Sequence, residues 1–151
     1  MIRPPHPNYK LDRKNGLYTT DLWDDIRELT SGYFAGDEPI RTKDKTRFHK
    51  QQTSMNVLLR IILSSSKSGD TILDPFSGTG TTSLVATQLH RKSISIDNSP
   101  RNIDCIKNRI EKIRNVDRVD RFYYSYRHTK NLDEIWGDTK RVKRDCQTTL
   151  N

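Results

Sequence analysis

The stretch Asp74-Pro75-Phe76-Ser77-Gly78-Thr79-Gly80-Thr81-Thr82 decides how this sequence folds. It follows Thr71-Ile72-Leu73-Asp74, a β-branched and apolar run that is too short for a helix. It leads into residues 82–90, where apolar side chains share one helical face. Two glycines in the stretch allow a tight turn and a close approach to a ligand, because no Cβ intervenes. We therefore expect a strand, a ligand-binding loop and a helix in that order.

A second strand and a second helix follow. Residues 93–97 read Ser-Ile-Ser-Ile-Asp, a short strand pattern, and Asn98-Ser99 then precede Pro100, which suits the first position of a helix. Apolar residues continue at helical spacing through Ile103, Ile106, Ile110 and Ile113. The β-α-β-α order predicts an α/β fold with a parallel sheet and flanking helices.

Three regions follow from the patterns on either side of the loop. Residues 1–52 are polar and broken by proline and glycine, so we expect a polar arm with loops, apart from a short structured patch at 22–26. Residues 53–114 form the core, which opens with an amphipathic helix over 53–66. Residues 115–151 are basic and polar, and we expect a tail in which 119–126 forms one further strand.

Composition sets the class of protein. The 151 residues include 27 Lys+Arg against 19 Asp+Glu, a formal net charge of +8, and 32% are hydrophobic. No apolar run is long enough for a signal peptide or a membrane span. Cys105 and Cys146 lack metal-ligand spacing, so we expect free thiols, no metal site and a cytoplasmic location. The basic charge favours a polyanionic partner such as nucleic acid.

The loop residues favour a nucleoside ligand over a phosphate. The loop contains no lysine, and the Gly-Lys-Ser/Thr ending of phosphate loops is absent. Asp74 at the end of the first strand suits a cationic or hydroxyl-bearing ligand. Asp97 ends the second strand, where α/β proteins hold ribose hydroxyls. A plain glycine turn with a helix-capping aspartate is the alternative interpretation of the same residues.

The sequence resembles the amino-group DNA methyltransferases, which make N6-methyladenine or N4-methylcytosine. The Asp-Pro-Phe-Ser-Gly-Thr-Gly loop carries the resemblance, which extends upstream past His49 to the element at Trp23 and covers about residues 21–114. It implies a partial Rossmann-like fold that binds S-adenosylmethionine. The cofactor-binding residues that it implies are Asp74, Phe76, Ser77, Gly78, Thr79, Gly80, Asp97 and Gln52. Asp74 would face the cationic amino-acid end of the cofactor, and Asp97 would accept the ribose hydroxyls.

The chain also departs from this family. After His49 it reads Gln51-Gln52-Thr53-Ser54, where the family usually has Thr-Gln-Lys-Pro. In this family a second loop, Asp/Asn/Ser-Pro-Pro-aromatic, orients the target amine. The only similar stretch in this sequence is Arg3-Pro4-Pro5-His6. It begins with arginine, which accepts no hydrogen bond from an amine. We therefore expect no catalytic residue in this chain.

These features favour the interpretation that the chain is the cofactor-binding half of a DNA methyltransferase. The expected partners are double-stranded DNA and a second polypeptide that carries the catalytic loop. Two alternatives stay open. One is an inactive remnant that binds nucleic acid, and the other is a complete small methyltransferase with a different substrate.

Positive charge is concentrated before the first core helix. Residues 41–60 contain six lysines and arginines and one acidic residue, Asp44. We predict that Lys43, Lys45 and Arg47 contact phosphates of DNA without reading its sequence. An ordinary solvated surface is the alternative.

Overall fold

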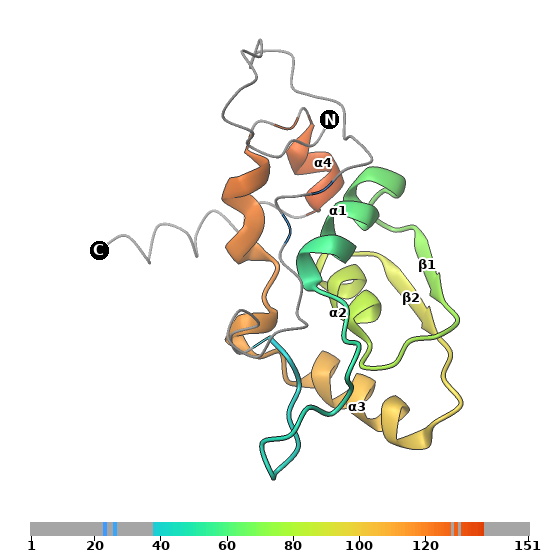
Figure 1. Cartoon of the computed structure of the whole chain (residues 1–151). Helices are drawn as coiled ribbons and strands as arrows, with labels where there is room; N and C mark the ends of the chain where they lie inside the picture. The colour runs from blue at the N-terminus through green and yellow to red at the C-terminus, as the bar shows by residue number, and fades with distance from the viewer. Residues whose placement is uncertain (1–22, 24–25, 27–37, 128, 130, 138–151) are drawn as a thin grey trace.

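The computed structural model describes residues 23, 26, 38–127, 129 and 131–137 (Figure 1). In chain order its elements are α1 (Met55–Ser65), β1 (Thr71–Asp74), α2 (Thr81–Gln88), β2 (Lys92–Ser95), α3 (Pro100–Glu111), the 3-10 helices η1 (Asn115–Asp117) and η2 (Asp120–Tyr126), and α4 (Leu132–Trp136). The strand, loop, helix, strand and helix predicted from residue 71 onward are confirmed.

The sheet of the described part is small and parallel. β1 and β2 pair in register from Thr71 opposite Lys92 to Asp74 opposite Ser95. The crossover helix α2 covers one face, where the hydroxyls of Ser83 and Ser95 are hydrogen-bonded. This arrangement is the predicted α/β class, a partial Rossmann-like fold.

Among the described residues, no element covers the opposite face of the sheet. Leu73 and Ile94 are register partners and are 61% and 52% exposed, and Ile96 just beyond β2 is 53% exposed. Side chains alternate between the two faces of a strand, so α2 cannot cover these three.

The core lies between α1, α2 and the C-terminal segment. Met55 and Leu59 of α1 and Leu84 of α2 are fully buried, and Trp136 of α4 is 2% exposed. Ser54 caps α1 by accepting a hydrogen bond from the backbone N–H of Asn56 at 3.3 Å. The helix predicted over 53–66 is thus confirmed, with Ser54 as its cap.

The segment after residue 114 differs from the prediction. Of the predicted strand 119–126, Asp120–Tyr126 form the 3-10 helix η2 instead, and Val119 precedes it as its N-cap. A period of three residues brings Tyr123 and Tyr126 to the same side, and both rings contact Trp136, with centroid distances of 5.1 and 5.8 Å. A strand would have sent these two rings to opposite faces.

The first part of the segment for which we expect a basic tail contributes side chains to the core. Residues 115–127 and 131–137 pack onto the core, while 138–151 lie outside the described residues. Buried Arg91 fixes α4, because its Nη1 donates to the carbonyl oxygen of Ile135 at 2.5 Å and its Nη2 to that of Ser66 at 2.8 Å. The core needs these distant aromatic residues, since the chain has few apolar ones.

The apolar stripe predicted for α3 is also narrower than expected. Ile106 is buried and Ile103 and Ile110 are half-buried, but Ile113 lies beyond the end of the helix and is exposed. Arg109 is buried instead of Ile113, although the apolar spacing did not mark Arg109 as a core position.

Three further findings concern the described residues. No helix there is long and apolar enough to cross a membrane. No group of three or more His, Cys, Asp or Glu side chains there could hold a metal ion. Cys105 is a free thiol, and Cys146 lies outside the described part.

Candidate cofactor site

A hollow of about 520 Å³ opens where β1 and β2 end, within the usual size range of small-molecule sites. In parallel α/β folds the carboxyl ends of the strands are the usual place for a ligand. The residues that line it are His49, Gln51, Thr53, Leu58, Pro75, Phe76, Ser77, Gly78, Thr79, Thr81, Thr82, Ile96, Asp97, Asn98 and Asn102.

Local hydrogen bonds fix the loop that forms one wall. The backbone N–H of Ser77 donates to the carbonyl oxygen of Ile96 at 3.0 Å, and its hydroxyl donates to the carbonyl oxygen of Asp74 at 2.8 Å. The N–H of Gly80 closes a tight turn onto the carbonyl oxygen of Ser77 at 2.7 Å. Gly78 and Gly80 have φ values of +49° and +72°, which side chains with a Cβ disfavour.

Asp97 links this loop to the second strand. Its Oδ2 accepts the backbone N–H of Gly78 at 2.8 Å, and its Oδ1 accepts the N–H of Ser99 and the side-chain amide of Asn102, both at 2.9 Å. The hydrogen bonds from Ser99, Asn102 and Gly78, with the charge of nearby His49, hold the pKa of Asp97 below its ordinary value. Asp97 is thus an ionised acceptor that keeps some lone-pair capacity on Oδ2.

The opposite wall comes from the segment that leads into α1. His49, Gln51 and Thr53 line the hollow there. A Cβ added at Gly78 would lie 3.9 Å from Nε2 of His49, so a side chain at position 78 would project into the space between the two walls. The missing side chain of Gly78 therefore leaves room in the hollow.

The structure brings five of the predicted cofactor residues together. These lining residues are Phe76, Ser77, Gly78, Thr79 and Asp97. Phe76 lines the hollow and its ring is 90% exposed, so the ring is accessible to a ligand.

The other three predicted residues have structural contacts instead. Asp74 accepts the N–H of Phe76 on Oδ1 at 3.1 Å. Gly80 is buried, and a Cβ there would lie 2.5 Å from Cγ1 of Ile106 on α3. Gln52 is buried and fixes the segment before it: its Nε2 donates to the carbonyl oxygen of Glu38 and its Oε1 accepts the N–H of Ile40.

Sequence reasoning missed several lining residues, of which Asn102 is the clearest. It lies on the first turn of α3, and its only signal in the sequence is an amide side chain five residues after Asp97. Thr81 and Thr82 also line the hollow from the first turn of α2.

The predicted DNA-contacting residues lie on a small hairpin. Arg41 and Arg47 form an antiparallel bridge, and the N–H of Thr42 donates to the carbonyl oxygen of Thr46 at 2.8 Å. Lys43 and Lys45 are exposed near its tip, and Arg47 is half-buried. In Figure 1 this hairpin projects from the body beside α3. In the sequence, the hairpin comes directly before the segment from His49 that forms one wall of the hollow.

Fold and hollow together define an α/β chain with a ligand-sized hollow at the carboxyl edge of a parallel sheet. The sequence profile of the DNA methylases of the N6/N4 type matches residues 4–108. The chain therefore belongs to this DNA methylase family.

Two relatives show how much of such a protein is present. The type II methyltransferase M2.LlaDCHI of Lactococcus lactis subsp. cremoris is 36% identical over 107 residues, which are 70% of this chain and 36% of that protein. The type II methyltransferase M.HinfI of Haemophilus influenzae is 40% identical over 79 residues, which are 52% of this chain and 22% of that protein. The chain spans about a third or less of these relatives.

Proposed function

We propose that this chain is the S-adenosylmethionine-binding half of a DNA methyltransferase that modifies the exocyclic amine of adenine (N6) or cytosine (N4). The observation that carries the proposal is the ionised Asp97, hydrogen-bonded to the N–H of Gly78 at the rim of a hollow of about 520 Å³. Because DNA is the substrate, we propose a cytoplasmic enzyme.

The residues around the hollow fit the parts of S-adenosylmethionine. Asp97 offers a carboxylate oxygen to ribose hydroxyls, which are hydrogen-bond donors. Phe76 presents an exposed ring on which an adenine can stack, and the base would remove that ring from water. Gly78 has no side chain and so leaves space for the ligand between the two walls of the hollow. Asp74 faces the backbone of the loop with one oxygen, and its role toward the amino-acid end of the cofactor stays a prediction.

When bound, S-adenosylmethionine supplies a methyl group whose bond to sulfur breaks as a bond to the amine nitrogen forms, while that nitrogen gives up a proton. This chain's part is to hold the donor. Transfer also requires the amine to be held in line with the methyl group at near-attack distance. The sequence has no Asp/Asn/Ser-Pro-Pro-aromatic loop for this task.

We propose that a second polypeptide carries that loop. The apolar side chains of Leu73, Ile94 and Ile96, which are exposed in the described part of the chain, support this proposal, because exposed apolar patches on folded proteins are often interaction surfaces. Ile96 also lines the hollow, so a polypeptide docked on this face would lie next to the cofactor.

Binding and transfer are tested separately. Calorimetric titration of the pure chain with S-adenosylhomocysteine should give saturable binding with one site per chain. With labelled S-adenosylmethionine and DNA, the chain alone should transfer no methyl group, and adding a polypeptide with the missing loop should restore transfer. Methylation by the pure chain alone would establish a complete enzyme. Binding without transfer, even with the added polypeptide, would favour an inactive remnant.

A further inference from the structure

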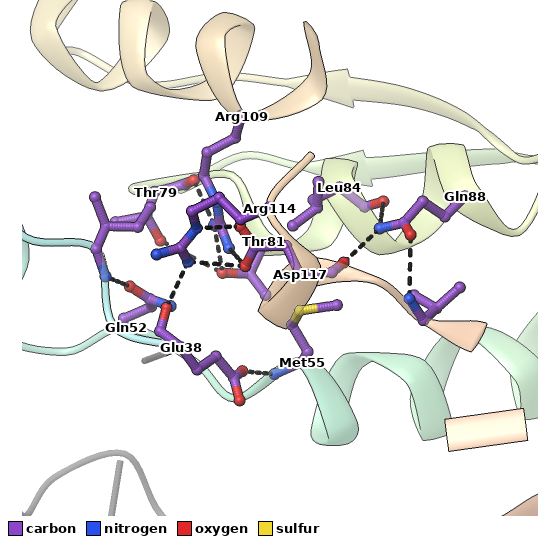
Figure 2. Close-up of polar contacts among 12 residues, drawn as sticks. Glu38, Gln52, Met55, Thr79, Thr81, Leu84, Gln88, Arg109, Arg114 and Asp117 are labelled. Carbon is purple, nitrogen blue, oxygen red and sulfur yellow. Dashed lines mark hydrogen bonds and ion pairs between the residues drawn. The ribbon is translucent and has the colours of Figure 1, made fainter. Parts of the chain in front are cut away.

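A chain of buried polar contacts joins residues that do not line the hollow to two residues of the loop that do (Figure 2). Arg109, on the last turn of α3, is 6% exposed. Its Nη1 donates to the carbonyl oxygen of Thr79 at 2.8 Å and to the hydroxyl of Thr81 at 3.1 Å. Both threonines line the hollow, whereas Arg109 does not. Arg109 therefore fixes the loop and the start of α2 without itself facing the hollow.

Asp117 fixes the other side of Arg109. The side chain of Asp117 is completely buried, and its Oδ1 accepts a hydrogen bond from Nη2 of Arg109 at 2.9 Å. Arg114 donates to both oxygens of Asp117, at 2.5 and 2.9 Å. Burial alone would raise the pKa of Asp117, but the hydrogen bonds and charges of Arg114 and Arg109 outweigh it, so its pKa lies below the ordinary value.

Arg114 extends the contacts to the opposite wall. Its Nη2 donates to the carbonyl oxygen of Glu38 at 2.7 Å, which also accepts Nε2 of Gln52 at 3.1 Å. The carboxylate of Glu38 accepts the N–H of Met55, the first residue of α1, at 2.6 Å. The segment held in this way contains the lining residues from His49 to Thr53.

We propose that Arg109 is a positioning residue, which keeps the backbone of residues 79–81 in the shape that binds the cofactor and connects it through Asp117 and Arg114 to the opposite wall. The inference rests on the proposed cofactor site. Its geometric part, the loop conformation, can be measured without any cofactor.

Physical chemistry favours this role over a purely stabilising one. A buried ion pair adds little net stability compared with an apolar replacement of similar volume, because both charges lose their hydration. The guanidinium is a planar fork of several donors, so it can set the relative positions of the carbonyl of Thr79, the hydroxyl of Thr81 and the carboxylate of Asp117. Lysine has a single charged nitrogen and cannot reproduce that geometry.

Hydrogen exchange of the unliganded chain tests the positioning. We compare Arg109→Met and Asp117→Asn with Lys107→Met, which removes one exposed positive charge from the same helix. The amides of Gly78, Gly80 and Leu84 are hydrogen-bonded in the loop and at the start of α2. They should exchange about tenfold faster in the first two variants and unchanged in the third.

The amide of Leu63 in α1 separates positioning from general loss of stability. A purely structural role would speed exchange of Leu63 by the same factor as that of Gly78 and Gly80, and this result would overturn the proposal. If Arg109→Met fails to fold, Arg109→Lys retains the charge beside Asp117 and is measured instead. The lysine variant should still show faster exchange in the loop alone.

Titration with S-adenosylhomocysteine then links positioning to the ligand. Affinity should fall about tenfold in Arg109→Met and Arg109→Lys and stay unchanged in Lys107→Met. Unchanged affinity in the arginine variants would overturn the link. If the wild-type chain itself does not bind, the proposed function fails, whereas the exchange pattern still decides whether Arg109 positions the loop.

Discussion

Gly78 and Asp97 are 19 positions apart in the sequence and are joined by a hydrogen bond of 2.8 Å from the backbone N–H to Oδ2. One carboxylate thus serves both the loop and the start of α3, because its other oxygen accepts the N–H of Ser99. The position and the charge of Asp97 are therefore fixed before a ligand hydroxyl binds to it.

Asp97→Asn should weaken binding of S-adenosylhomocysteine strongly. The amide replaces one acceptor oxygen with a donor, which faces either the N–H of Gly78 or the donors at Ser99 and Asn102. Calorimetry checks this, with Asp104→Asn as the control, because Asp104 is an exposed carboxylate on α3. Equal dissociation constants for wild type and Asp97→Asn would remove Asp97 from the site.

Phe76→Ala should weaken cofactor binding without destabilising the fold. The ring is 90% exposed, so its loss removes little packing from the free chain. Burying a phenylalanine ring contributes about 1.5–3 kcal/mol, so the dissociation constant should rise roughly 10- to 100-fold. The matched control is Tyr124→Ala, another exposed aromatic residue, on η2. Similar affinity in wild type and Phe76→Ala would show that the ring does not contact the ligand.

Gly80→Ala should destabilise the fold more than Gly78→Ala. A methyl group at position 80 would meet Cγ1 of Ile106 at 2.5 Å, whereas one at position 78 has ordinary contacts. Both substitutions carry about 1–2 kcal/mol of positive-φ strain, and overpacking adds about 1–3 kcal/mol at position 80. Urea unfolding of each variant measures the difference.

The background variant Ile106→Ala isolates the steric part of that difference. In this background most of the extra cost of Gly80→Ala over Gly78→Ala should disappear, because Cγ1 and Cγ2 of Ile106, the two nearest atoms, are gone and only Cβ at 3.1 Å remains. An undiminished cost would show that the Gly80–Ile106 contact is not what disfavours a side chain at position 80.

Neutralising Lys43, Lys45 and Arg47 together should weaken DNA binding for every sequence alike. Each lost phosphate contact lowers the slope of log K against log salt by about one, so the triple variant should lose up to about 3. Replacing the exposed lysines at 67, 92 and 107 removes equal charge elsewhere and should leave most of the slope. The measurement is a salt titration with the partner polypeptide present. An unchanged slope in the hairpin variant would place the DNA contacts elsewhere.

Acid should unfold the chain partly through Asp117. Because the pKa of Asp117 in the folded chain lies below its ordinary value of 3.8, its stabilisation is complete above that value and is lost as pH falls through the folded pKa. The free energy of unfolding of the wild type should therefore fall more steeply below about pH 4 than that of Asp117→Asn. Parallel curves, measured by urea unfolding from pH 7 to pH 2.5, would contradict this assignment.

The sequence by itself determined the local elements and the identity of the loop. A strand, a glycine turn and an amphipathic helix are encoded by neighbouring residues, so the order from Thr71 through α3 and the helix within 53–66 could be predicted. Asp97 was also predictable, because its position after a second strand follows from that order.

Only the tertiary structure decided which predicted residues reach the hollow and what holds them. Gly80 packs on Ile106, and Gln52 holds the segment before it, through contacts that join residues distant in sequence. The contact of Arg109 with Thr79 spans 30 positions, and no local pattern marks it. Periodicity reports which face of one element is apolar; it does not report which distant partner satisfies a buried polar group, and that requirement is met only when the chain has folded.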